Sequence, residues 1–270
     1  MEAGHVWTVE DSVADGIGET ASIPRQPNGN WHPDCESVEA ILARANVRDM
    51  KLLPTGSNYV FVLALEDDAA GPGAAVYKPQ RGETPLWDYP SGTLYRRERA
   101  AYVLSEALGW GIVPPTIVRD GPHGIGMVQL HIDHEPRQNY FTIKDHRQEE
   151  LRRLALFDVI LNNGDRKGGH CLIDAERRIW GIDHGLTFHH QGKLRTVVWD
   201  FIGEPMPAHL LAEVEQLLAR LQRGAPEVAE LDDLLNKNER KALRQRTEQS
   251  LARGVYPDPP PWRPVPWPAL

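Results

Sequence analysis

The sequence predicts an α+β fold, with a small lobe built on an antiparallel sheet and a mainly helical lobe after it. The first half alternates short β-type runs with two helical stretches, and the second half shows long stretches of helical periodicity. Turns rich in glycine and proline separate these runs. The chain has 270 residues, of which 41% are hydrophobic and 25% charged, so there is ample apolar material for the cores.

Composition excludes several classes of protein. The net charge of −8 argues against a general nucleic-acid binder, because such proteins usually carry a basic face. Two cysteines, Cys35 and Cys171, are too few for a disulfide framework and favour reduced thiols in the cytoplasm. No basic segment followed by an apolar run opens the chain, and no window approaches 18 consecutive apolar residues. We therefore expect a cytoplasmic protein without a signal peptide or a transmembrane segment.

The elements of the small lobe follow in order. Residues 1–33 are polar and rich in glycine, proline and asparagine, so we expect a loosely packed N-terminal arm. A helical stripe of apolar residues begins at Ser37. Two apolar runs then flank Pro54–Asn58, a polar turn with a glycine, which indicates a β-hairpin. A further β-type run ends at Lys78, where Pro79 stops it.

A helix follows in residues 90–111, where Ser91 or Thr93 can cap the start and Gly109 can end it. Its apolar face consists of Leu94, Ala101, Leu104 and Leu108. β-type runs around a glycine- and proline-containing turn occupy residues 112–133. We therefore expect the small lobe to span residues 34–128.

The second lobe is expected over residues 129–255. Helical periodicity covers residues 149–163 and 206–224, and residues 230–254 form one further helix or two. The last segment, residues 256–270, is rich in proline and contains two tryptophans, so it should be extended. This tail either binds a partner that reads extended proline-rich segments or packs back on its own lobe.

Two aspartates in the second lobe point to chemistry. Asp165 and Asp183 each follow an apolar element, and residues 170–182 between them alternate like a hairpin with a turn at residues 174–176. A hairpin brings its ends together, so both carboxylates can face one cleft. Two carboxylates with an amide or an imidazole between them suit a divalent cation and the phosphates it holds. The alternative is that both aspartates cap helices or turns, but the lysine and the glycine-containing turn upstream favour the cation site.

The spacing matches the order of parts in kinases, which use a catalytic-loop aspartate, a metal-binding side chain five positions later and a metal-binding aspartate in a D-F-G element. His170 lies five positions after Asp165, and Asp183-His184-Gly185 stands in the place of D-F-G. Lys78 ends its strand as the phosphate-binding lysine does, and Glu98 on the following helix can pair with it. Backbone N–H groups of one turn can cover the phosphates, and its residues are Thr55, Gly56, Ser57 and Asn58.

These motifs carry a resemblance to a known family. The sequence NNGDRKGGH at residues 162–170, followed by GIDHG at residues 181–185, resembles the catalytic loop and D-F-G element of the phosphatidylinositol 3- and 4-kinase superfamily. More narrowly, these motifs together with LLPTGSN and GWGIVPPT resemble a family of short bacterial proteins related to those kinases. The resemblance implies a two-lobed protein-kinase-like fold that uses ATP and Mg²⁺ or Mn²⁺. It implies an ATP-dependent kinase, and leaves open whether the hydroxyl acceptor is a protein, a metabolite or a lipid headgroup.

The resemblance also implies a role for each matching residue. Lys78 would hold the α- and β-phosphates and Glu98 would orient it. Asp165 would accept the proton of the acceptor hydroxyl, and Arg166 would brace the catalytic loop. The residues implied to meet adenine through their backbone are Gln129, Leu130 and His131.

Two positions depart from the family pattern. His170 and Asp183 would hold the metal, but the family has Asn where this chain has His170, and imidazole suits Mn²⁺ better than Mg²⁺. Asn162 and Asn163 either compensate for this change or end the preceding helix. His184 replaces the Phe of D-F-G, so we expect an apolar packing element to be lost there.

Three hypotheses follow: an active kinase, a nucleotide-binding pseudokinase, and a metal-dependent hydrolase built on Asp165, His170, Asp183 and His184.

Two sets of basic residues outside these motifs each allow two interpretations. The arginines at positions 96, 97 and 99 are expected to form a solvated helix face, with an anion site as the alternative. Lys193 and Arg195, which follow the D-H-G motif, lie either in an exposed loop or against the acceptor substrate.

Overall fold

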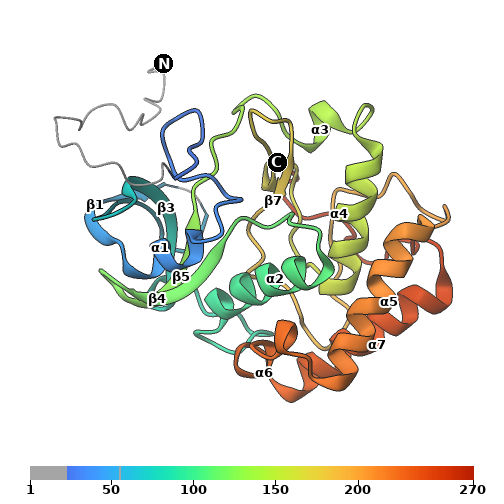
Figure 1. The fold of residues 1–270 in the computed structure, drawn as a ribbon. Coiled ribbons are helices and arrows are strands. Elements are labelled where there is room, and N and C mark those ends of the chain that lie inside the picture. The colour runs from blue at the N-terminus through green and yellow to red at the C-terminus, as the bar shows by residue number, and fades with distance from the viewer. Residues whose placement is uncertain (1–22, 55) are drawn as a thin grey trace. The chain divides into compact units, whose positions relative to one another are not determined.

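The structure is a computed structural model that describes residues 23–54 and 56–270 (Figure 1). The expectations for residues 1–22 of the arm and for Thr55 lie outside the described residues. Contacts divide the chain into two units. The sheet unit comprises the described residues up to Thr84 and Pro115–Asp133, and the helical unit comprises Pro85–Pro114 and His134–Leu270.

The sheet unit is built on a five-stranded antiparallel sheet in the order β1-β2-β3-β5-β4. Its elements are α1 (Val38–Arg44), β1 (Asn46–Leu53), β2 (Val60–Asp67), β3 (Gly71–Pro79), the short 3-10 helix η2 (Gln80–Gly82), β4 (Thr116–Gly121) and β5 (Gly124–Leu130). Buried and less buried residues alternate along β2 and, from Pro72 onward, along β3, so one face of the sheet forms the core. Helix α1 packs against β4 and β5. The predicted hairpin around residues 54–58 is confirmed by the pairing of β1 with β2.

The described part of the N-terminal arm is firmly packed, contrary to expectation. Trp31 and Asn30 are both fully buried. The Asn30 side-chain amide donates to the carbonyl oxygens of Ala74 (3.0 Å) and His131 (2.8 Å), and its Oδ1 accepts from the N–H of Ala74 (2.8 Å). An asparagine here continues the backbone pairing of β3, because its amide offers the same donor and acceptor as a peptide group. Residues 23–33 are therefore part of the sheet unit rather than a loose lead-in.

The helical unit holds most of the helices and one short hairpin. Its elements are α2 (Leu94–Leu108), α3 (Tyr140–Ile143), α4 (Gln148–Leu161), the 3-10 helix η3 (Gly168–His170), β6 (Cys171–Ile173), β7 (Ile179–Gly181), α5 (Ala208–Arg223), the 3-10 helix η4 (Pro226–Val228), α6 (Leu231–Leu234) and α7 (Lys237–Arg253). Helices α4 and α5 both pack against α7, and α2 packs against α5 and α6 (Figure 1). The predicted helices over residues 149–163 and 206–224 are confirmed, and residues 230–254 form two helices.

Helix α2 belongs to the helical unit, although residues 34–128 were expected to form the small lobe. Arg97 on this helix is 1% exposed, so the expected solvated face is wrong at this position. Its guanidinium pairs with Glu239 of α7, which is itself buried, and donates to the carbonyl oxygen of Thr187 (3.1 Å). A buried arginine is tolerated because these partners satisfy its charge and its donors.

The proline-rich tail packs back on the helical unit, the second of the two alternatives. The carbonyl oxygen of Pro264 accepts hydrogen bonds from the N–H of Thr196 (3.0 Å) and the indole of Trp199 (3.1 Å). The carbonyl oxygen of Ala269 accepts from the N–H of Gly168 (2.7 Å) in the loop that follows Asp165. The tail therefore supports the loop that carries the candidate chemistry.

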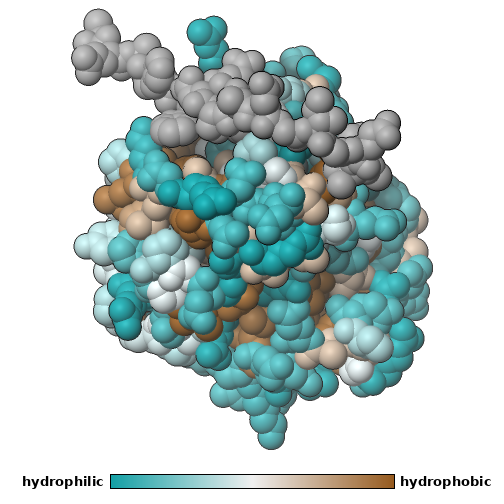
Figure 2. Space-filling view, turned by 60° about the vertical axis from the view of Figure 1, so that its left-hand side comes forward, coloured by the Kyte–Doolittle hydropathy of each residue, from teal (hydrophilic) through white to brown (hydrophobic). Residues whose placement is uncertain are grey.

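The predicted α+β class, with an antiparallel sheet in one unit and mainly helices in the other, is confirmed. Within the described residues, no helix is long and apolar enough to cross a membrane. Cys35 and Cys171 are free thiols, as expected, and burial raises the pKa of the Cys171 thiol to about 12. The face shown in Figure 2 is mostly hydrophilic, with hydrophobic residues in scattered groups between the polar ones.

The packing of Trp31 predicts that Gly73→Ala destabilises the sheet unit. A Cβ atom at Gly73 would lie 2.6 Å from Cε2 of the buried Trp31 indole, and overpacking of this kind costs roughly 1–3 kcal/mol. Thermal or urea unfolding measures this loss. Gly192→Ala is the matched control, because a Cβ there meets nothing within 4 Å. Equal stability of the two variants would contradict the described packing of residues 23–33.

Candidate active site

Two asparagines end helix α4 and anchor the loop after it. Asn162 adopts the left-handed conformation (φ 56°), and its side-chain amide donates to the carbonyl oxygens of His189 (2.9 Å) and Gln191 (2.6 Å). The Asn163 amide donates to Asp158 Oδ1 (2.9 Å), and its Oδ1 accepts from the N–H of Asp165 (3.0 Å). Two roles were considered for these asparagines: to compensate for the change at His170, or to end the preceding helix. The contacts show the second role, since both residues end α4 and hold the loop after it.

Arg166 is the centre of the loop. It is fully buried, and its Nε and Nη2 lie 3.1–3.2 Å from the carboxylate of Asp158, which is also fully buried. Its Nη1 donates to the carbonyl oxygens of Ile182 (2.8 Å) and His170 (3.2 Å). Burial alone would lower the pKa of Arg166, but the negative charge of Asp158 raises it above its ordinary value. The guanidinium thus stays charged and braces the loop after Asp165. That this is a catalytic loop stays a prediction.

His184 completes this network. Its Nε2 lies 2.6 Å from Arg166 Nη2. A guanidinium only donates, so this Nε2 carries no proton and the imidazole is neutral with its proton on Nδ1. The ring is fully buried and packs edge-on against Phe157, with 5.8 Å between ring centroids. The expected loss of a packing element at this position is therefore wrong, because the imidazole both fills the space and accepts a hydrogen bond.

Glu98 supports the same motif from helix α2. It is 1% exposed, and its Oε2 accepts a hydrogen bond from the N–H of His184 (2.8 Å). Glu98 therefore holds the backbone of Asp183-His184-Gly185 in the helical unit. Lys78 belongs to the sheet unit, so its pairing with Glu98 stays a prediction.

The predicted hairpin brings the two candidate metal ligands together. β6 pairs with β7, and the N–H of Ile182 donates to the carbonyl oxygen of His170 (3.0 Å). His170 Nε2 lies 3.3 Å from Asp183 Oδ2. Asp183 has a positive φ of 60°, an unusual conformation for a residue with a side chain. Strained residues of this kind cluster at functional sites.

Neighbouring groups act on the pKa of Asp165 in opposite directions. Burial raises the pKa of its carboxyl group, the charge of Asp183 raises it further, and Lys167 and Arg195 oppose this. Lys167 Nζ lies 3.3 Å from Asp165 Oδ2, and Arg195 Nη2 lies 4.0 Å from Oδ1. The net effect is a raised pKa, which makes Asp165 a better proton acceptor than an exposed aspartate.

The donor set fits a metal that is shared with a substrate. Among residues 23–54 and 56–270, no three or more His, Cys, Asp or Glu side chains are grouped to hold a metal ion. An imidazole and a carboxylate, His170 and Asp183, are nevertheless close enough to bind one cation together. Mg²⁺ is typically bound by one or two protein ligands, with phosphates and water completing its shell. The hydrolase hypothesis loses support, because it needs His184 in the cluster and this ring bonds Arg166.

Asp158 and Lys167 also belong to the site, although the sequence motifs did not predict them. A signal for Asp158 was present, since it is an acidic residue inside the apolar helical stretch LALFDVIL, where a buried charge requires a partner. Lys193, considered for substrate contact, is paired with Asp88 (2.9 Å) and lies over the ring of Trp87. Arg195, the other such candidate, faces Asp165.

The remaining predicted residues lie in the sheet unit. Lys78 is in β3 opposite Met127 of β5, and Gly56, Ser57 and Asn58 form the turn between β1 and β2. Gln129 donates to Thr116 Oγ1 (2.8 Å). The segment expected to meet adenine is Gln129, Leu130 and His131.

The backbone of His131 is already engaged. Its N–H donates to the carbonyl oxygen of Ala74 (3.1 Å), and its carbonyl oxygen accepts from the side chains of Gln26 (2.9 Å) and Asn30 (2.8 Å). Contact with adenine through the His131 backbone would therefore require one of these bonds to open.

Comparison with known proteins found one close relative. No family model matches the chain. Protein Rv2133c of Mycobacterium tuberculosis (strain ATCC 25618 / H37Rv) is 41% identical over 230 residues, which cover 72% of this chain and 82% of that protein.

Similar solved structures include two kinases and a Fam20 protein. The Golgi casein kinase with Mn/ADP bound is 14% identical (TM-score 0.49), and the match covers 80% of this chain and 74% of that chain. Helicobacter pylori proinflammatory kinase CtkA is 11% identical (TM-score 0.48), with 80% and 94% covered. Hydra Fam20 with sugar is 12% identical (TM-score 0.46), with 80% and 87% covered. At TM-scores below 0.5, this likeness identifies no activity or ligand for the chain.

The raised pKa of Asp165 predicts that Asp165→Asn stabilises the protein at neutral and alkaline pH. The folded state holds this proton more tightly than the unfolded chain, so wild-type stability falls as the pH rises through the raised pKa. The neutral amide avoids this loss. We expect a higher Tm for the variant at pH 8, with the difference shrinking as the pH approaches about 4, the ordinary pKa of aspartate.

Differential scanning fluorimetry across this pH range measures the effect. Asp68→Asn, at an exposed position, is the control and should show no such pH-dependent difference. A wild type that is more stable than Asp165→Asn at pH 8 would contradict the described burial of Asp165.

Proposed function

The chain belongs to the family of Protein Rv2133c, and we propose that it is an ATP-dependent kinase that transfers the γ-phosphate of ATP to a hydroxyl acceptor. One observation carries this proposal: the β6–β7 hairpin brings His170 and Asp183 together, and the charge of Asp183 acts on Asp165 in the loop before it. Phosphoryl transfer needs little covalent chemistry from the protein, and depends on positioning and neutralisation of charge. A rigid loop with a proton acceptor, a lysine and a pair of metal ligands suits this reaction.

Within the proposed reaction, Asp165 accepts the proton of the acceptor hydroxyl. Its raised pKa supports this role, because a proton acceptor works best when its pKa is not far below the working pH. Lys167, whose Nζ is 3.3 Å from Asp165, is positioned to balance negative charge that arrives with the transferred phosphate. Arg166 takes no part in proton transfer and acts by holding the loop.

His170 and Asp183 would hold the divalent metal, Mg²⁺ or Mn²⁺. Held by these two residues, such a metal would supply positive charge to neutralise the phosphates. We propose that Lys78 contacts the α- and β-phosphates with Glu98 as its partner. We also propose that the turn at residues 55–58 covers the phosphates and that residues 129–131 lie against adenine.

From the resemblance of the motifs, we propose that this activity belongs to the phosphatidylinositol 3- and 4-kinase-like superfamily. The acceptor remains unassigned among proteins, metabolites and lipid headgroups. One observation favours a second candidate, a nucleotide-binding pseudokinase. His170 stands where the family has an asparagine and already contacts Asp183, so metal binding must replace an imidazole–carboxylate contact.

Incubation with labelled ATP and either Mg²⁺ or Mn²⁺ tests the proposal. We expect Asp165→Ala and Lys78→Ala to lower phosphate transfer or ATP turnover by about 100-fold or more, as loss of a proton acceptor or a phosphate ligand does. Lys51→Ala and Asp68→Asn, both at exposed positions, are the matched controls and should retain activity. Nucleotide binding without turnover would favour the pseudokinase. If nucleotide causes no thermal shift with either metal, both the kinase and the pseudokinase are excluded.

His170→Asn tests the metal assignment. An amide oxygen is a harder ligand than imidazole, so the variant should shift its preference from Mn²⁺ toward Mg²⁺. The ratio of the metal concentrations that give half of the maximal nucleotide-induced thermal shift measures this preference. His209→Asn, on the exposed surface of α5, is the control and should leave the ratio unchanged. An unchanged ratio in His170→Asn would remove His170 from the metal site.

A further inference from the structure

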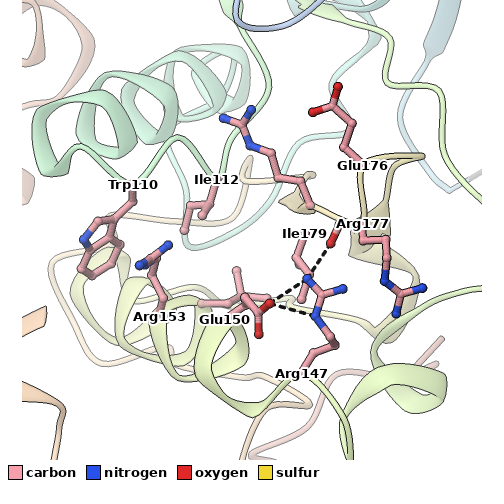
Figure 3. Close-up of a pocket in the computed structure, with 10 residues that line it drawn as sticks. Trp110, Ile112, Arg147, Glu150, Arg153, Glu176, Arg177 and Ile179 are labelled. Atoms are coloured by element: carbon pink, nitrogen blue, oxygen red, sulfur yellow. Dashed lines mark hydrogen bonds and ion pairs between the residues drawn. The ribbon is translucent and has the colours of Figure 1, made fainter. Parts of the chain in front are cut away.

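A cavity lies within the helical unit, lined by none of the residues assigned above to the candidate active site. Its volume is about 320 Å³, within the range of small-molecule sites. The first turns of α4, the turn of the β6–β7 hairpin and the segment after α2 line it (Figure 3). In this view Trp110 and Arg153 lie on one side, and Arg147 and Arg177 lie on the other.

The lining carries excess positive charge. It contains four arginines, at positions 147, 153, 177 and 178, against two glutamates, at positions 150 and 176. The difference, four minus two, is a formal charge of +2 in a chain whose net charge is −8. A concentration of cations in a cavity of an acidic protein favours an anionic ligand.

One of these arginines, Arg147, is already hydrogen-bonded to other residues of the helical unit. Arg147 donates from Nε to Glu150 (2.8 Å) and from Nη2 to the carbonyl oxygen of Arg177 (2.5 Å), as Figure 3 shows. Burial opposes ionisation of Glu150, but the hydrogen bond from Arg147 and the charge of Arg153 hold its pKa below the usual range. Glu150 is therefore ionised and neutralises Arg147, and the remaining cations determine the charge of the cavity.

Arg153 has an unsatisfied donor here. Its Nε is buried and has no hydrogen-bond partner among the residues that the structure describes. Buried polar groups in native proteins are almost always hydrogen-bonded, so the unused Nε–H shows that the protein does not hold this guanidinium through that group. The enclosed Nε is not itself reached from the cavity, and it is the rest of the Arg153 side chain that lines it. The guanidinium presents its donors as a planar fork that matches the oxygens of an oxyanion.

We propose that this cavity binds a small organic phosphate, with its phosphate group held by Arg153 and its apolar part against Trp110 and Ile179. A phosphate monoester carries a charge of roughly −1.5 to −2 at neutral pH and three acceptor oxygens. This matches the formal +2 of the lining better than a carboxylate, which has one charge and two oxygens. The site is independent of the proposed phosphate transfer.

Isothermal titration calorimetry with phenyl phosphate, in the presence and absence of ADP, tests the proposal. We expect phenyl phosphate to bind more tightly than benzoate, and benzyl alcohol to bind at least 10-fold more weakly, because it lacks the charge. Arg153→Gln should weaken phenyl phosphate binding by roughly 10-fold or more, the effect of losing a charge-assisted hydrogen bond. Arg223→Gln, at an exposed position on α5, is the matched control and should bind as wild type does.

Four results would overturn the proposal: no binding of phenyl phosphate, equal affinity in Arg153→Gln, tighter binding of benzoate, or loss of binding when ADP is present. The last would assign the probe to a nucleotide site instead. Arg177→Gln serves as a second variant if Arg153→Gln fails to fold, because Arg177 is exposed in the hairpin turn. Its affinity for phenyl phosphate should fall several-fold, and an unchanged affinity would count against the site.

Discussion

The buried ion pair between Arg166 and Asp158 is the constraint on which the candidate active site depends. Neither side chain is exposed, and removing one partner of such a pair typically costs about 3–5 kcal/mol because the other charge is left buried. The same guanidinium bonds the backbone of His170 and Ile182 and the ring of His184. It therefore ties the loop after Asp165 to the open end of the following hairpin, so one side chain holds the segments that carry the candidate base and the candidate metal ligands.

This network explains why His184 suits a position where the related motif has Phe. The ring must fill a buried space beside Phe157, and it must also meet the one Arg166 donor that faces it. A phenyl ring meets only the first requirement. A neutral imidazole meets both, because Nε2 accepts from the guanidinium without adding a second buried positive charge.

Much of the architecture was predictable because it is locally encoded. Apolar periodicity predicted helices α4 and α5. The alternation of apolar and polar residues between Asp165 and Asp183 predicted the β6–β7 hairpin. The contacts that could not be predicted join residues far apart in the chain. Arg97 is buried because Glu239, 142 positions away, neutralises it, and Asn30 is buried because it completes the pairing of β3. Neither residue differs locally from a solvated one, so periodicity could not distinguish them.

Two elements are shared by the candidate active site and the arginine-lined cavity. The first turns of α4 line the cavity, while Asp158 near its other end holds Arg166. The β6–β7 hairpin presents its turn to the cavity and carries His170 and Asp183 at its opposite end. Its strands are three residues each, and its turn is tied down by Asp174, which accepts hydrogen bonds from the Arg178 N–H and the Trp180 indole. Positive φ angles occur at Arg177 and at Asp183, so backbone strain is held at both ends of one short, rigid element. The same short hairpin therefore positions both the turn that lines the cavity and the two candidate metal ligands.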